Sequence, residues 1–143
     1  MKKNDIEVVW AILCGGSSVD SETNNISIYK VLEQITLTKG NGSVPTGPHL
    51  IPLQHEYVIL LQRPDPVGKP KSYAMTMKLR GPDGEVVNEA PTPAHFESGK
   101  KRLRLRIQNA SFPVTVPGEY RFEIWTEGED TPRSSTPFVV IVK

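Results

Sequence analysis

The chain has 143 residues and a formal net charge of +1, with 37% hydrophobic and 23% charged residues. This length favours one domain over residues 1–143 with a core of its own. The balanced charge argues against a nucleic-acid-binding or membrane-surface protein, and no apolar run reaches the roughly 18 residues of a membrane-spanning helix. The 13 prolines and 11 glycines, many between apolar runs, favour short strands over long helices.

The single cysteine, Cys14, cannot form an internal disulfide, which favours a reducing compartment. The apolar run 8–14 is short for a secretory signal, and Gly15-Gly16 follows it without a convincing cleavage site. A cytoplasmic location is therefore expected.

Apolar runs and alternation of apolar with polar residues predict about eight strands. The unbroken run 8–14 predicts a strand buried on both faces or covered on its outer face. A polar loop is expected over 15–25. The segment 26–37 is strand-like with a break near Lys30, and a helical turn over 29–34 is the alternative. The other expected strands are 56–63, 72–80, 85–88, 100–107, 119–125 and 137–142.

The sequence Gly-Pro-Asp-Gly at 81–84 predicts a hairpin turn, because Asp-Gly readily adopts the positive φ values of tight turns. Strand 119–125 is expected to pair antiparallel with 137–142 and to form the middle of a sheet that also holds 103–107. Tyr120 lies just after a Pro-Gly turn, where a tyrosine corner bonds its hydroxyl to upstream backbone. The alternative is an apolar-face tyrosine with its hydroxyl at the rim.

These elements predict an all-β fold, a two-sheet antiparallel β-sandwich of immunoglobulin-like or related Greek-key type. The antibody family itself is not indicated, because only one cysteine exists and Trp125 lies on a late strand. The irregular stretch 39–53 and the connection 88–99 are long enough to project as recognition loops. The alternative is that both are ordered connections between the sheets.

A basic stripe at 100–106 contains Arg102, Arg104 and Arg106 at alternate positions, about 7 Å apart on one face of a strand. Such an array can bind phosphates, anionic lipid headgroups or an acidic partner. The stripe lacks the interleaved aromatic residues of nucleic-acid-binding sheets. The alternative is a solvated face whose arginines pair with acids of a neighbouring strand, namely Glu119, Glu123 or Glu127.

No catalytic, cofactor-binding or metal-binding residue is predicted. The histidines His49, His55 and His95 lack zinc-ligand spacing. Loop carboxylates can gather at one end of a sandwich and bind calcium, but dense Asp-x-Asp loops are absent; these carboxylates are Asp20, Glu22, Asp65, Asp83, Glu129 and Asp130. Cys14 ends an apolar run, and such cysteines are mostly buried and inert. An enzyme would need a cleft where Cys14 or a histidine meets a carboxylate.

The first third of the chain carries a recurring order of segments. It consists of Trp10-Ala11-Ile12-Leu13-Cys14, then Val19-Asp20, then a strand over 26–31 and Ile35. This order resembles the start of a family of small uncharacterised bacterial proteins, and segments 117–122 and 137–140 are similar to that family's ending. The resemblance implies a bacterial, cytosolic β-sandwich and adds no activity.

The apolar runs 8–14 and 58–61 exceed what one buried face of a strand needs. We therefore expect a non-enzymatic interaction or structural module that binds a protein partner or self-associates. The alternative function is binding of an anionic ligand or surface through Arg102, Arg104 and Arg106.

Overall fold

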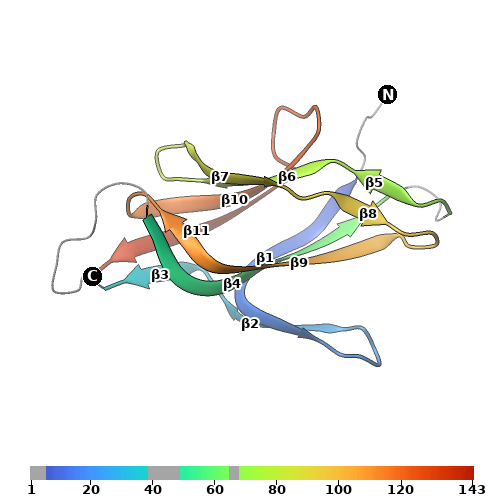
Figure 1. Cartoon of the computed structure of the whole chain (residues 1–143), viewed down its shortest axis with the longest axis horizontal. Coiled ribbons are helices and arrows are strands. Elements are labelled where there is room, and N and C mark those ends of the chain that lie inside the picture. The colour runs from blue at the N-terminus through green and yellow to red at the C-terminus, as the bar shows by residue number, and fades with distance from the viewer. Residues whose placement is uncertain (1–5, 39–48, 65–67) are drawn as a thin grey trace.

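The computed structural model describes residues 6–38, 49–64 and 68–143. These residues form eleven strands: β1 (Glu7–Val19), β2 (Ile26–Val31), β3 (Gln34–Leu37), β4 (His49–Gln62), β5 (Lys71–Tyr73), β6 (Met75–Arg80), β7 (Val86–Pro91), β8 (Ala94–Phe96), β9 (Arg102–Val114), β10 (Gly118–Thr126) and β11 (Ser134–Val142). One sheet has the order β2-β1-β4-β9, a second β3-β11-β10-β6-β7, and β5 pairs with β8. Figure 1 shows β6, β7 and β10 stacked above β1, β4 and β9.

The predicted all-β sandwich is confirmed, with more strands than the eight expected. Neighbouring strands pair antiparallel, except that β11 pairs parallel with β3. Segment 26–37 breaks as expected, and its halves join different sheets. The helical alternative for 29–34 is wrong. Lys30, one residue before the end of β2, has a φ of 54°, a left-handed conformation outside the β region.

Three stretches outside the expected strands are partly strand. β1 continues through Gly15 to Val19, so the predicted polar loop over 15–25 shrinks to a turn. β9 continues to Val114, beyond the strand expected over 100–107. Residues 49–53 belong to β4, and 39–48 lie outside the described residues. Polar and proline residues suggested loops here, but β4 and β9 pair beyond Pro52 and Pro113 after a register shift between Pro52 and His55.

The core between the two layers is built on aromatic rings. Phe112 of β9 meets Phe138 edge-on at a centroid distance of 5.2 Å and Tyr120 at 5.9 Å. Tyr57 of β4 stacks on Phe122 of β10 at 4.9 Å. Burying an aromatic side chain of this kind contributes about 1.5–3 kcal/mol, so the cluster fixes the two sheets face to face.

The expected pairing of 119–125 with 137–142 is confirmed, and β10 is the central strand of its sheet. Its second neighbour is β6, because residues 103–107 belong to β9 in the other sheet. The prediction that placed 103–107 beside β10 is therefore wrong. Alternation identifies both strands as half-buried but does not determine which sheet each one joins.

Tyr120 forms the predicted tyrosine corner. Its hydroxyl donates a hydrogen bond to the carbonyl oxygen of Val116 at 2.5 Å and accepts one from the Thr115 N–H at 3.0 Å. Gly118 precedes it with a φ of 141°, and a Cβ there would lie 2.8 Å from Pro82. Only glycine suits this turn, which packs against the β6–β7 hairpin. The corner and the sheet order are those of an immunoglobulin-like sandwich.

The hairpin predicted around 81–84 is confirmed by the antiparallel pairing of β6 with β7. The connection expected over 88–99 contains the rest of β7 and all of β8. Part of it is therefore an ordered element of the sandwich, as the alternative held. β7 forms one edge of the five-stranded sheet, and β9 forms one edge of the four-stranded sheet.

Candidate functional site

The arginines of the basic stripe lie on the outer face of β9, and two of them reach across the sheet. Arg104 donates a hydrogen bond to the carbonyl oxygen of Asn24 at 2.7 Å. Arg106 donates to Ser17 Oγ at 2.8 Å and to the Ser17 carbonyl oxygen at 2.9 Å. Arg102 instead donates to the side chain of Gln62 on β4, at 2.9 Å. Arg104 and Arg106 thus hold the hairpin formed by β1 and β2.

This β1–β2 hairpin covers the outer face of the four-stranded sheet. Cys14 is the last β1 residue that pairs with β4, opposite Glu56. Three residues further along β1, the side chain of Ser17 also contacts Glu56. This part of β1 therefore crosses over the outer face of the sheet instead of continuing alongside β4. Figure 1 shows β2 below β4 and β9, while β6, β7 and β10 of the five-stranded sheet lie above them. Beneath this cover, Cys14 and Val58 are fully buried. The predicted covering of the run 8–14 therefore holds at its end but not at Val9, which is exposed.

Glu56 is a buried carboxylate at the base of the hairpin. It accepts hydrogen bonds from Ser17 Oγ and, at 2.9 Å, from Gln108 Nε2, and Arg106 lies 3.8 Å away. Burial raises the pKa of Glu56, but the two hydrogen bonds and the Arg106 charge together hold the pKa below its ordinary value. A polar cavity of about 330 Å³ opens beside it, lined by Gly15, Gln54, His55, Gln108, Asn109 and Ala110.

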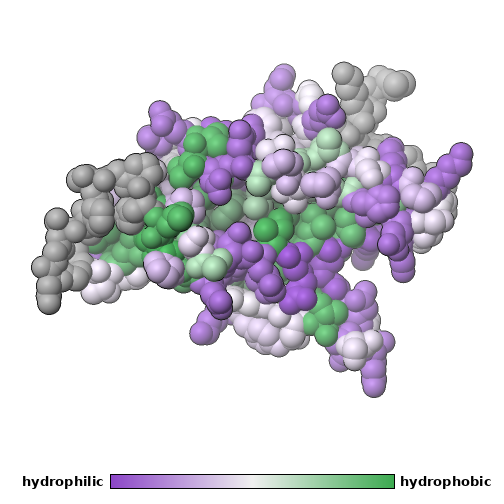
Figure 2. Space-filling view, viewed as in Figure 1, coloured by the Kyte–Doolittle hydropathy of each residue, from purple (hydrophilic) through white to green (hydrophobic). Residues whose placement is uncertain are grey.

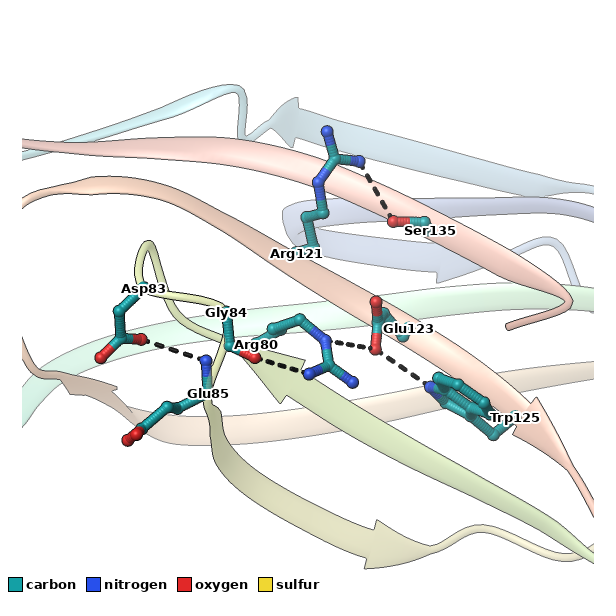
Figure 3. Close-up of polar contacts among 8 residues, drawn as sticks. All are labelled: Arg80, Asp83, Gly84, Glu85, Arg121, Glu123, Trp125 and Ser135. Carbon is teal, nitrogen blue, oxygen red and sulfur yellow. Dashed lines mark hydrogen bonds and ion pairs between the residues drawn. The ribbon is translucent and has the colours of Figure 1, made fainter. Parts of the chain in front are cut away.

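The acids proposed as partners of the arginine stripe lie on the other sheet. Glu123 of β10 pairs with Arg80 at 3.0 Å and accepts a hydrogen bond from Trp125 Nε1 at 3.0 Å, as Figure 3 shows. Glu119 pairs with Arg121 at 3.2 Å. The predicted pairing of the stripe with Glu119 or Glu123 is therefore wrong, because it assumed that β9 and β10 were neighbours.

A groove opens between β7 and β9, the facing edges of the two sheets. It has a volume of about 380 Å³. Figure 2 shows apolar surface in the band below β7 and above β9. The groove is lined by His55, Met77, Leu79, Asn88, Ala90, Pro91, Thr92, Pro93, Ile107, Asn109, Ser111, Phe112, Pro113 and Phe122. It therefore reaches from the surface to the aromatic rings of the core.

β9 borders this groove as a long edge strand of 13 residues. Its inward side chains Leu103, Leu105 and Ile107 pack against the core yet stay partly exposed. One side of the strand pairs with β4, and no described strand pairs with the other side. Alternate backbone N–H and C=O groups along that free edge therefore lack a strand partner.

The cysteine and the histidines that were considered for catalysis lie in different parts of the structure. Cys14 is fully buried, and burial raises the pKa of its thiol. His55 is buried between the rings of Phe112 and Phe122 and contacts the Leu53 carbonyl oxygen at 2.9 Å. His95 is exposed on β8, 2.7 Å from Ser72 Oγ. The side chain of His49 lies outside the described residues.

The loop carboxylates shape their own turns. Asp20 accepts hydrogen bonds from the Glu22 and Thr23 N–H groups, and Asp83 accepts one from the Glu85 N–H. Glu129 pairs with Arg133 at 2.6 Å. Asp65 lies outside the described residues. Within residues 6–38, 49–64 and 68–143, no three His, Cys, Asp or Glu side chains lie close enough to hold a metal ion.

No family model and no curated protein matches the chain, so the resemblance to uncharacterised bacterial proteins stays a prediction. Among solved structures, the chain is similar to the alkylpurine DNA glycosylase AlkC of Pseudomonas fluorescens, bound to DNA containing an abasic site analog. The TM-score is 0.54 at 10% identity, over 96% of this chain and 30% of the glycosylase. The likeness shows a shared fold, and this chain spans less than a third of that protein.

An immunoglobulin-like protein of Pseudomonas aeruginosa aligns with 96% of this chain and 98% of its own length, at 13% identity and a TM-score of 0.40.

In the part of the chain that the structure describes, no helix has the length and apolar character to cross a membrane.

Proposed function

We propose that this chain is a non-enzymatic interaction module that binds a segment of a protein partner in the groove between β7 and β9. The observation that carries the proposal is that an apolar groove of about 380 Å³ lies between β7 and β9, two sheet edges to which no further described strand is paired. Its size lies in the range of about 300–1,000 Å³ that ligand sites occupy. The reducing cytoplasm, which the single Cys14 favours, is part of the proposal.

A protein segment suits this groove better than a reacting small molecule. His55 lines the groove with Ser111 and Thr92, but its ring contacts the Leu53 carbonyl oxygen, and no hydrogen bond joins it to either hydroxyl among the described residues. Cys14 is buried under the β1–β2 hairpin on the other side of the sheet. The groove does border a free strand edge, to which extended peptides add through backbone hydrogen bonds while their side chains fill adjacent pockets. An uncovered edge of this length also invites unspecific aggregation unless something pairs with it.

Selection from a displayed library of random peptides tests the proposal. Ala90 is an exposed β7 residue in the groove, so Ala90→Arg fills the groove without disturbing the core. We expect Ala90→Arg to weaken the binding of the selected peptides at least about tenfold, or by about 1.4 kcal/mol. Thr36→Arg, on the exposed β3 edge, is the matched control and should have no effect. Equal affinity for Ala90→Arg and the unchanged chain would contradict groove binding.

Binding of an anionic ligand is the second candidate, favoured by the exposed basic residues Lys100, Lys101 and Arg102 at the start of the stripe. The glycosylase of similar fold is bound to DNA, so single-stranded DNA, heparin and anionic vesicles are suitable probes. Changing all three residues to serine leaves the contacts of Arg104 and Arg106 with the hairpin intact. Binding that is unaffected by this triple change would contradict the candidate.

A further inference from the structure

We infer that the partner segment is an extended strand that adds to the free edge of β9 and alternates acidic with apolar side chains. This inference rests on the proposed function of the groove and specifies the chemistry of its partner.

The alternation follows from the two faces of β9. Arg102, Arg104 and Arg106 point to the outer face, where they contact β4 and the hairpin. Leu103, Leu105 and Ile107 point to the core and stay partly exposed. Residues directly opposite each other on paired strands share a face, with side chains close enough to interact. A strand added to β9 therefore presents every second side chain to the arginines and the others to the apolar side.

The charge of the outer face favours acidic residues at the first set of positions. The stripe arginines bond mainly to neutral acceptors, which are Gln62, Asn24 and Ser17. In the described residues, the carboxylate paired with the stripe is Glu56, 3.8 Å from Arg106. Positive charge is thus in excess along this face, and carboxylates opposite it would be attracted.

The inner face favours apolar residues at the second set. Side chains there would extend the row of Leu103, Leu105 and Ile107. The side chain opposite Ile107 would enter the groove, which Ile107 lines together with Met77 and Phe122. Burial of each apolar side chain is then the main favourable term, while the backbone bonds fix the register.

A second copy of the chain fits this edge poorly. Two β9 strands paired antiparallel would bring arginines of the two stripes against each other, which is destabilising. β7 of a second copy offers Glu89 as its only acid and ends at Pro91, which has no N–H to donate. The sequence of the edge therefore favours a different protein as partner.

Three capped synthetic peptides test the inference against the full chain by fluorescence anisotropy. One alternates valine and glutamate, one alternates valine and lysine, and one has the valines and glutamates in two separate blocks. We expect the alternating glutamate peptide to bind at least about tenfold more tightly than the other two. Its affinity should fall with added salt and with Arg102→Ser, because the attraction is between exposed charges.

Two results would overturn the inference: equal binding of the lysine and glutamate peptides, or equal binding of the block and alternating peptides. If library-selected peptides without acidic alternation still lose affinity in Ala90→Arg, the groove function stands and only the proposed partner chemistry fails. If Ala90→Arg affects no peptide at all, the groove function itself fails.

Discussion

The outer face of the four-stranded sheet and its β9 edge both present apolar side chains, but they differ in what covers them. On the outer face, Val58 is fully buried beneath the chain's own β1–β2 hairpin, which Arg104 and Arg106 hold in place. Along the edge, Leu103, Leu105 and Ile107 remain partly exposed. The chain therefore completes one surface itself and leaves the other open, where a partner can add without displacing any strand.

The largest expected difference is between a core residue and an edge residue. Phe138 packs against Phe112, Tyr120 and Phe122, so Phe138→Ala should lower the free energy of unfolding by about 3–5 kcal/mol. Leu105→Ala should lower it by only about 1–2 kcal/mol, because a partly exposed side chain loses less burial. Denaturant unfolding measures both. Equal losses would show that the β9 edge is as enclosed as the core.

The hairpin cover should depend on Arg106 more than on Arg102. Arg106→Ala removes the bonds to Ser17 and the charge beside buried Glu56, and should lower the free energy of unfolding by about 1.5–3 kcal/mol. The rate of backbone amide exchange should rise in β2, the second strand of the hairpin. Arg102→Ala is the matched control, with an expected change within about 0.5 kcal/mol. Indistinguishable exchange in the two variants would contradict the role of Arg106.

A smaller effect should appear in acid. Glu56 has a pKa below its ordinary value of 4.5 in the folded chain, so the unfolded chain binds its proton more readily. The stability that Glu56 contributes is therefore present above that ordinary value and is lost as the pH falls through the folded-state pKa. Glu56→Gln should flatten the acid limb of the stability curve, measured by urea unfolding across the acidic range. An unchanged acid limb would contradict this contribution.

The sequence predicts local structure well, because alternation and turn residues act over a few positions. The hairpin at 81–84 and the corner at Tyr120 follow from such short signals, and both are confirmed. The outward face of the arginine stripe is also correct. Its partners Ser17 and Asn24 were missed, because they depend on a turn of the chain after Cys14 that alternation does not encode.

The groove was missed for a related reason. Among its lining residues are Ala90, Ile107 and Phe122, which lie on three different strands of the two sheets. Each residue alone is an ordinary member of a half-buried strand. The signal that was available, an apolar content beyond the needs of one face, pointed to strands 8–14 and 58–61, where Cys14 and Val58 lie buried under the hairpin and Val9 is exposed.

Amide exchange along β9, followed by NMR with and without the alternating valine–glutamate peptide, tests strand addition most directly. Amides on the free edge of β9, at alternate residues between Arg102 and Val114, should exchange quickly in the free chain and slowly in the complex. The remaining β9 amides, bonded to β4, should be slow in both states. Unchanged β9 exchange, with protection arising instead in β2 or β3, would contradict binding at this edge.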